Sequence, residues 1–190
     1  DRERDVIKAR YGLGGGKPMT LQTIGNRYGI TRERVRQIEE AGLKSLSSKI
    51  NHAYFKTFVD EAVNQLKGVG GVQMEAAFLN EFQKSLSEKI TTAEFGNAAR
   101  FLLELSGKVK HHRDNYNYDW NHFVYLSDAD KKKAHAFVAK LILNLNNKKG
   151  SALSERNFNE FLRITARSFK LSEPIAKNYL AISKRFIVSP

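Results

Sequence analysis

The first fifty residues carry apolar positions at helical spacing, interrupted twice by glycine. A first helix is predicted over residues 2–11, where apolar residues recur among charged ones, and a run of glycines ends it. Thr20 and Thr31 each stand where a threonine can cap the start of a following helix. Gly29 lies between those two helices and can adopt the left-handed conformation of a tight turn. Two helices joined by a short glycine turn are typical of a helix-turn-helix.

The helix predicted after Thr31 has two chemically different faces. At about 100° per residue, four polar side chains fall on one side of the helix and four small or apolar residues fall on the other. The polar set is Arg32, Glu33, Arg36 and Gln37, and the apolar set is Val35, Ile38, Gly42 and Leu46. We expect the apolar set to pack on the preceding helices, while the polar set projects from the turns that enter a major groove.

These four polar residues are of the types that contact base edges. Arginine can form two hydrogen bonds with guanine, glutamine pairs with adenine, and glutamate accepts from the cytosine amino group. A solvated helix face is also rich in arginine and glutamate, but it does not account for the capped turn, its glycine and the basic charge. We therefore interpret the helix as a DNA-reading element.

Residues 51–128 are predicted to form a winged-helix-like module. Apolar residues spaced by three and four predict helices over residues 54–66, around residues 78–86 and from Thr92 onward. The period then changes to that of strands at residues 109–113 and 123–126, which flank the polar turn 115–119. Three helices followed by a hairpin are typical of a winged helix.

Three aromatic residues stand in or beside the predicted turn: Tyr116, Tyr118 and Trp120. At the tip of a hairpin, aromatic side chains can touch a groove or a partner. For Trp120 we favour a packing role.

A similar order of helices recurs about 80 residues later, in residues 129–190. The pairs that match are Glu75 with Glu155, Phe78 with Phe158, Phe95 with Ile175, and Leu102 with Ile182. We expect a duplicated module whose second copy loses its hairpin at the end of the chain, with residues 146–150 as an internal loop. The predicted fold class is mainly α: a helix-turn-helix over 1–50, then two similar winged-helix-like modules, 51–128 and 129–190, with a short β-hairpin.

Basic charge is concentrated at the two ends of the chain. The formal net charge of +12 divides into +5 over residues 1–50, −1 over 51–127 and +8 over 128–190. A polyanion is the commonest partner of such a surface, so we expect phosphate contacts at the ends and a spacer or protein-contact role in the middle. The candidates for a second DNA contact lie on or beside the last predicted helix; they are Lys177, Lys184 and Arg185.

The segments 2–7, 10–13 and 20–25, and above all Thr31-Arg32-Glu33-Arg34-Val35-Arg36-Gln37-Ile38-Glu39, resemble region 4 of primary-type bacterial sigma factors. The resemblance covers about a quarter of the chain. It implies that the domain reads the minus-35 promoter element and docks on the flap of the RNA polymerase beta subunit. It also implies the roles of individual residues: Arg32, Glu33, Arg36 and Gln37 face bases, and Arg10, Thr20 and Thr31 lie near phosphates.

Two features depart from the family pattern. Glu40-Ala41-Gly42 stands where a basic, alanine-rich stretch usually follows, which leaves the length of the helix and its activator contacts open. The residues also show no counterpart of the helix that precedes Arg2 in the family, or of the regions that bind core polymerase and read the minus-10 element. Beyond residue 50, the element order is similar to that of winged-helix domains of the HARE type, found in the RNA polymerase delta subunit.

The residues favour no catalytic, metal or cofactor site. Cysteine is absent, and His111 and His112 are adjacent in a predicted strand, so that their side chains diverge. The stretch from Gly12 to Lys17 lacks the order of a phosphate loop, and no nucleophile elbow or dinucleotide fingerprint is present. We therefore expect neither an enzyme nor a bound cofactor.

The location of the protein follows from what its sequence lacks. No apolar run approaches the roughly 20 residues of a membrane span, and the first residues do not resemble a signal peptide. We expect a cytoplasmic, nucleoid-associated protein that contacts no membrane. Because the chain starts at Asp1 without Met and ends at Pro190, we also expect it to be a fragment.

The leading hypothesis is a sigma-like transcription initiation factor whose partners are promoter DNA, as a duplex, and the RNA polymerase core. One alternative is a transcriptional regulator that carries this reader without the rest of a sigma factor. Another makes residues 51–190 a protein-interaction adaptor, or the accessory part of a DNA-processing enzyme. The exact DNA target, the oligomeric state and the role of the duplicated modules are left open.

Overall fold

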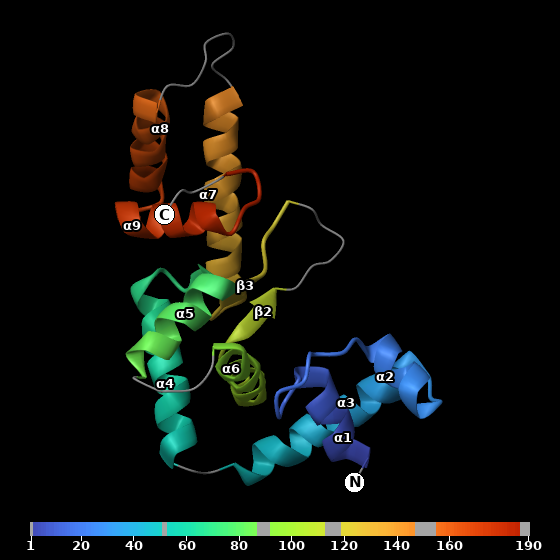
Figure 1. Cartoon of the computed structure of the whole chain (residues 1–190). Helices are drawn as coiled ribbons and strands as arrows, with labels where there is room; N and C mark the ends of the chain where they lie inside the picture. The colour runs from blue at the N-terminus through green and yellow to red at the C-terminus, as the bar shows by residue number, and fades with distance from the viewer. Residues whose placement is uncertain (1, 51–52, 87–91, 113–118, 147–154, 187–190) are drawn as a thin grey trace. The chain divides into compact units, whose positions relative to one another are not determined.

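The computed structural model describes residues 2–50, 53–86, 92–112, 119–146 and 155–186. These residues form two compact units, one built from residues 1–62 and 79–108 and the other from 63–78 and 109–190. Both are mainly helical, and the second holds a small antiparallel sheet (Figure 1). The predicted fold class is therefore confirmed, while the division into domains 1–50, 51–128 and 129–190 stays a prediction.

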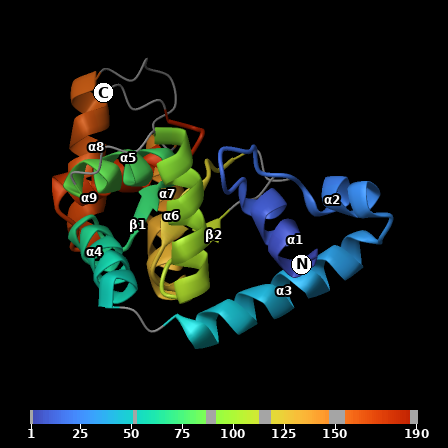
Figure 2. The ribbon, with the colours of Figure 1, turned by 60° about the horizontal axis from the view of Figure 1, so that its bottom comes forward.

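The first unit begins with the three helices expected from the sequence. They are α1 (Arg2–Tyr11), α2 (Leu21–Tyr28) and α3 (Arg32–Lys49). Both α1 and α2 pack on α3, with α2 beside its N-terminal end (Figure 2). The side chains of Val6, Ile24 and Val35, one from each helix, are fully buried at their centre. The apolar spacing of each helix therefore produces a common core, as the helix-turn-helix pattern predicts.

The first unit also contains parts of α4 (Ala53–Gly68) and α5 (Glu75–Ser85) and the whole of α6 (Thr92–Ser106). The ring of Phe82 from α5 lies 4.9 Å from that of Phe58 and 6.0 Å from that of Phe95, measured between centroids. Phe82 is fully buried. The aromatic residues at helical spacing therefore form core.

Helix α6 also packs against α1 and α3, a contact that was not predicted. The rings of Tyr11 and Phe101 meet edge to face, with 5.1 Å between their centroids. Asn97 Nδ2 donates hydrogen bonds to the backbone oxygens of Gly12, at 3.1 Å, and Gly16, at 3.3 Å. Helix α6 therefore fixes the glycine-rich loop that connects α1 to α2.

The second unit contains three short strands, β1 (Val72–Met74), β2 (Lys110–His112) and β3 (Phe123–Tyr125). They form an antiparallel sheet in the order β1-β3-β2, in which Tyr125 lies opposite both Val72 and Lys110. The predicted hairpin is confirmed as β2 and β3. Strand β1 was not predicted, because a segment of three residues directly after two glycines is too short to show the alternation of a strand.

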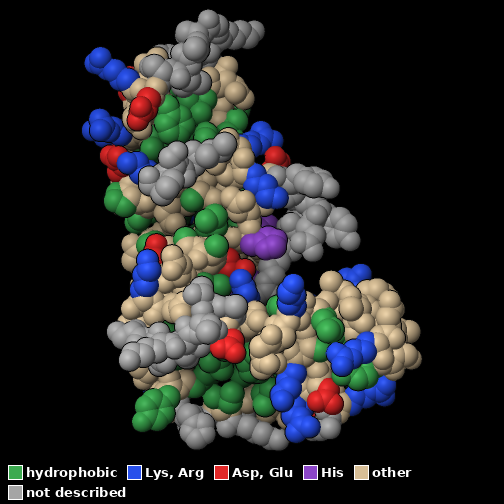
Figure 3. Space-filling view, in the orientation of Figure 1, with side chains coloured by type: hydrophobic (Ala, Val, Ile, Leu, Met, Phe, Trp, Pro, Cys, Tyr) green, Lys and Arg blue, Asp and Glu red, His purple; other side chains and the backbone are tan. Residues whose placement is uncertain are grey.

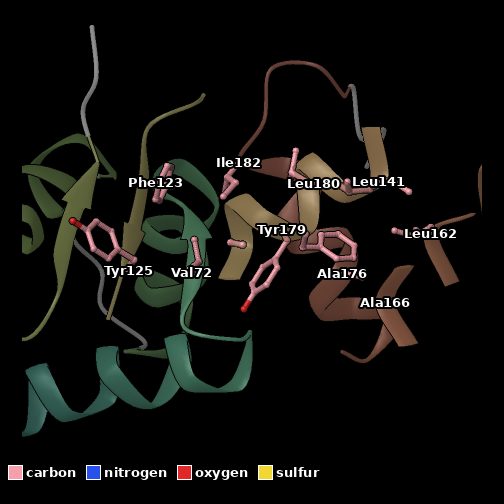
Figure 4. Close-up of a cluster of buried hydrophobic side chains, with 13 residues drawn as sticks. Val72, Phe123, Tyr125, Leu141, Leu162, Ala166, Ala176, Tyr179, Leu180 and Ile182 are labelled. Carbon is pink, nitrogen blue, oxygen red and sulfur yellow. The ribbon is translucent and has the colours of Figure 1, made fainter. Parts of the chain in front are cut away.

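The helices of the second unit are α7 (Asp128–Asn146), α8 (Glu155–Ser168) and α9 (Glu173–Ala181). Helices α7 and α8 lie side by side and α9 packs on both (Figure 1). Residues from the sheet and the three helices share one apolar core, which includes fully buried Tyr179 (Figure 4). Phe137 belongs to the same core and is also fully buried. The Tyr179 hydroxyl donates to the backbone oxygen of Gly70 at 2.6 Å, tying α9 to the turn before β1.

Trp120 packs inside this unit, as predicted. Its indole stacks on the His135 ring with 3.9 Å between centroids, and its backbone forms a β-bridge with Ser183. Burial, together with the charge of Lys131, lowers the pKa of His135 to about 4. Tyr116 and Tyr118 lie outside the described residues, as do positions 147–150 of the predicted loop.

Candidate DNA-binding surface

The turn between α2 and α3 is built by two threonines and two glycines. Thr20 Oγ1 accepts a hydrogen bond from the backbone N–H of Thr23, and Thr31 Oγ1 accepts from that of Arg34, both at 3.1 Å. Gly29 adopts the left-handed conformation with φ of 64°. Both predicted caps and the predicted glycine turn are confirmed.

Gly25 is required in this turn for a reason that the sequence did not reveal. The backbone N–H of Ile30 donates to the backbone oxygen of Gly25 at 3.0 Å. A Cβ atom at Gly25 would lie only 2.7 Å from the backbone oxygen of Ile30. Only glycine therefore allows the chain to pass this close as it enters α3.

Helix α3 has the two faces that were predicted. Val35 and Gly42 are buried and Ile38 and Leu46 are half-buried, all toward the preceding helices. A Cβ at Gly42 would lie 3.3 Å from Ile7 Cγ1, so this glycine allows α1 to approach closely. The polar set, Arg32, Glu33, Arg36 and Gln37, is exposed.

Within the polar set, Arg36 is held by two carboxylates on the same helix. Its Nη2 lies 2.7 Å from Glu33 Oε1, and its Nη1 also forms an ion pair with Glu40. The hydrogen bond from Arg36 lowers the pKa of Glu33, and the two carboxylates raise the pKa of Arg36. Arg34 Nη1 donates to Gln37 Oε1 at 3.2 Å. Glu40 and Arg34 were not among the predicted site residues. Glu40 lies four residues after Arg36 and Arg34 lies three residues before Gln37, the spacings at which helical side chains pair.

Arg10, a predicted phosphate contact, points into the fold. Its Nε donates to Glu39 Oε1 at 3.0 Å and its Nη1 to the backbone oxygen of Met19 at 3.1 Å. Glu39 is only 8% exposed. At 100° per residue Glu39 falls at the edge of the apolar face of α3, about 20° from Leu46, so its burial does not follow clearly from the helical pattern. The structure thus gives Arg10 a role in holding α1, α3 and the loop together.

The other predicted phosphate contacts, Thr20 and Thr31, are exposed at the N-terminal ends of α2 and α3. Helix N-termini present free backbone N–H groups and the positive end of the helix dipole, which attract phosphate. Position and chemistry therefore suit a phosphate at both residues.

The candidates for a second DNA contact are exposed residues of the second unit. Lys177 lies on α9 and pairs with Glu173, with 2.9 Å between Nζ and Oε1. Lys184 and Arg185 follow the end of α9, and Arg185 Nε lies 3.1 Å from Asp119 Oδ1. Two of these three cations are thus partly neutralised within the fold.

One buried histidine, His111, lies against a carboxylate. His111 Nδ1 lies 3.0 Å from Glu75 Oε1, and both side chains are buried. No three His, Cys, Asp or Glu residues in the described part of the chain come together as metal ligands would. None of the helices described combines the length and apolar character that a membrane crossing requires.

Comparison with known proteins finds similarity in the N-terminal segment. Residues 1–48 match the family "Sigma-70, region 4". The chain is also 43% identical over 58 residues to the RNA polymerase sigma factor SigA1 of Synechococcus elongatus, an alignment that covers 30% of this chain and 14% of the relative. No solved structure matches the chain. The predicted resemblance to sigma factor region 4 is therefore confirmed for the N-terminal segment.

Proposed function

We propose that residues 1–48, the sigma-70 region 4 segment, place α3 in the major groove of promoter DNA as part of a transcription factor without catalytic activity. The observation that carries this proposal is the exposed polar set on the first turns of α3, whose opposite face is clamped by α1 and α2. Base contacts are assigned to Arg32, Glu33, Arg36 and Gln37, and a minus-35-like element is the proposed target.

Phosphate contacts in the same complex are assigned to Thr20 and Thr31, supported by their exposure at helix N-termini. Arg10 remains a candidate through the 30% of its side chain that is exposed. A partner of this segment is RNA polymerase, through the flap of its beta subunit. This assignment is supported by the family match alone.

Loss of the Arg36 or Gln37 side chain tests base contact. Arg36→Ala and Gln37→Ala are each expected to weaken binding to the preferred duplex by about 5- to 150-fold, because a base-edge contact is lost. Binding to a scrambled duplex falls much less. Fluorescence anisotropy with both duplexes measures the difference, after selection of the preferred duplex from a random pool.

Lys17→Ala serves as the matched control, since Lys17 is exposed in the loop before α2, outside α3. It removes a cation without removing a proposed base contact, and should not change the ratio of the two affinities. An Arg36→Ala variant with equal losses on both duplexes would contradict base reading.

The carboxylate of Glu40 is expected to restrain Arg36 in the free protein. Glu40→Gln removes one of the two ion pairs of Arg36 and a negative charge on the same helix. Duplex binding should therefore tighten by roughly two- to fivefold, within the range of exposed ion pairs. Glu61→Gln, an equal charge change on α4, is the control. Anisotropy titrations measure the duplex affinity of both variants. An equal gain in affinity in Glu40→Gln and Glu61→Gln would show a general charge effect and contradict the restraint of Arg36.

A further inference from the structure

Three arginines of α8 lie along a single line on its exposed face. With Arg156 set at 0°, Arg163 and Arg167 fall at about 340° and 20° around the helix. All three side chains are exposed. At 1.5 Å per residue, the line from Arg156 to Arg167 is about 16 Å long, close to the rise of five nucleotides of one strand along the DNA axis, at about 3.4 Å per nucleotide.

The opposite face of α8 is anchored in the core, which fixes the direction of the arginine line. Leu162, Thr165 and Ala166 are buried, and Asn144 Nδ2 on α7 donates to Thr165 Oγ1 at 3.0 Å. The helix cannot rotate about its axis without breaking these contacts. The three guanidinium groups are therefore presented together rather than as scattered surface charges.

The charge of this face is only slightly compensated. Arg163 Nε lies 3.8 Å from Glu173 Oε2, whereas Arg156 and Arg167 form no ion pair with any residue that the structure describes. Glu160 is exposed near the line and pairs with none of the three arginines. Just past the helix, Lys170 is exposed as well, in a left-handed conformation with φ of 53°.

The line continues toward α9. Glu173 lies between Arg163 and Lys177, at 3.8 Å from the first and 2.9 Å from the second. Figure 3 shows Lys and Arg side chains gathered along the edge over α8 and α9, with Asp or Glu between them. A straight row of guanidinium groups suits a rigid polyanion with regular spacing, since the planar fork of arginine matches phosphate oxygens.

We propose that Arg156, Arg163 and Arg167 on α8 form a second, sequence-independent binding surface for the phosphate backbone of duplex DNA. The choice of DNA rather than another polyanion rests on the proposed function of the first unit. This surface is distinct from α3, and its residues differ from the predicted Lys177, Lys184 and Arg185. It uses three of the thirteen Lys and Arg residues in the basic C-terminal part of the chain, residues 128–190.

The test compares two triple variants of the whole chain with equal loss of charge. One is Arg156→Gln/Arg163→Gln/Arg167→Gln on α8, and the other changes three exposed lysines of α7: Lys132→Gln/Lys133→Gln/Lys140→Gln. Binding to a duplex of scrambled sequence is measured between about 50 and 200 mM salt. Each lost phosphate contact lowers the magnitude of the slope of log K against log salt by about 0.9. The slope should therefore fall in magnitude by about 2–3 in the α8 variant and by less than about one in the α7 variant.

A third variant, with lysine at the three α8 positions, keeps the charge and should keep most of the slope, which separates charge loss from misfolding. Equal losses in the two glutamine variants, or an unchanged α8 variant, would overturn the proposal. So would an α8-dependent preference for duplex RNA or for polyglutamate over duplex DNA. Arg36→Ala, measured on the same scrambled duplex, separates the two surfaces, because it should leave the α8 contribution to the slope intact.

Discussion

Replacing Gly25 with alanine is expected to destabilise the first unit by about 1–3 kcal/mol and to reduce DNA binding sharply, because the added methyl overfills a closed turn. Its Cβ would lie 2.7 Å from the backbone oxygen of Ile30 and 3.5 Å from the backbone N of Arg32. These are backbone atoms, so no flexible side chain can move aside. Relief requires the start of α3 to shift, and with it the exposed polar set. Chemical denaturation and duplex binding measure the two effects.

Gly29 offers a matched control in the same turn. A Cβ at Gly29 meets nothing within 4 Å, but φ is +64°. Gly29→Asn should therefore fold and bind DNA nearly as well as the parent chain, because asparagine tolerates the left-handed region. If Gly25→Ala and Gly29→Asn behaved alike, close packing at Gly25 would not be what positions α3.

The features of the helix-turn-helix that could be predicted from sequence are those that depend on residues close to one another in the chain. Thr20, Thr31 and Gly29 act within one helical turn of their own positions, so cap and turn chemistry sufficed to place them. The faces of α3 follow from helical periodicity for the same reason. Local rules also predicted the hairpin of β2 and β3.

The features that were not predicted depend on contacts between residues that are far apart in the sequence. Arg10 was predicted to contact phosphate, but its partner Glu39 is 29 positions away and lies at the edge of the apolar face of α3. The hydrogen bond from Asn97 to Gly12 joins residues 85 positions apart, and no periodic pattern encodes it. The arginines of α8 were not among the predicted site residues, because the predicted second contact lies on or beside α9, whereas Arg156, Arg163 and Arg167 lie on α8.

The ion pairs of α3 connect its structure to its proposed specificity. In the free protein Glu33 and Glu40 occupy the donor groups of Arg36, so binding of guanine must replace those hydrogen bonds rather than simply add to them. On scrambled DNA, without a suitable base edge, Arg36 loses little by staying paired with its carboxylates. The same network thus lowers the net gain from the guanine contact, which is the physical reason for the tighter binding expected of Glu40→Gln.

Replacing Tyr11 with alanine is expected to destabilise the first unit by about 3–5 kcal/mol, the usual cost of removing a buried aromatic side chain. Tyr11 is only 5% exposed, and burial, with the nearby carboxylate of Glu104, raises the pKa of its hydroxyl. Part of that loss should come from the edge-to-face contact with Phe101 on α6. Denaturation of Tyr11→Ala, Phe101→Ala and the double variant measures the coupling, expected at about 0.5–1.5 kcal/mol. Tyr54→Ala, at a residue 90% exposed, is the control and should change stability by less than about 0.5 kcal/mol.

The coupling energy between Tyr11 and Phe101 shows whether α6 stabilises the helix-turn-helix. Tyr11 ends α1 directly before the glycine loop that Asn97 holds, so a favourable coupling means that α6, about 80 residues downstream, stabilises the arrangement of α1 on α3. DNA affinity should then fall in Phe101→Ala although Phe101 is not on α3. A coupling of zero, with unchanged DNA affinity in Phe101→Ala, would instead mean that the helix-turn-helix folds independently of α6.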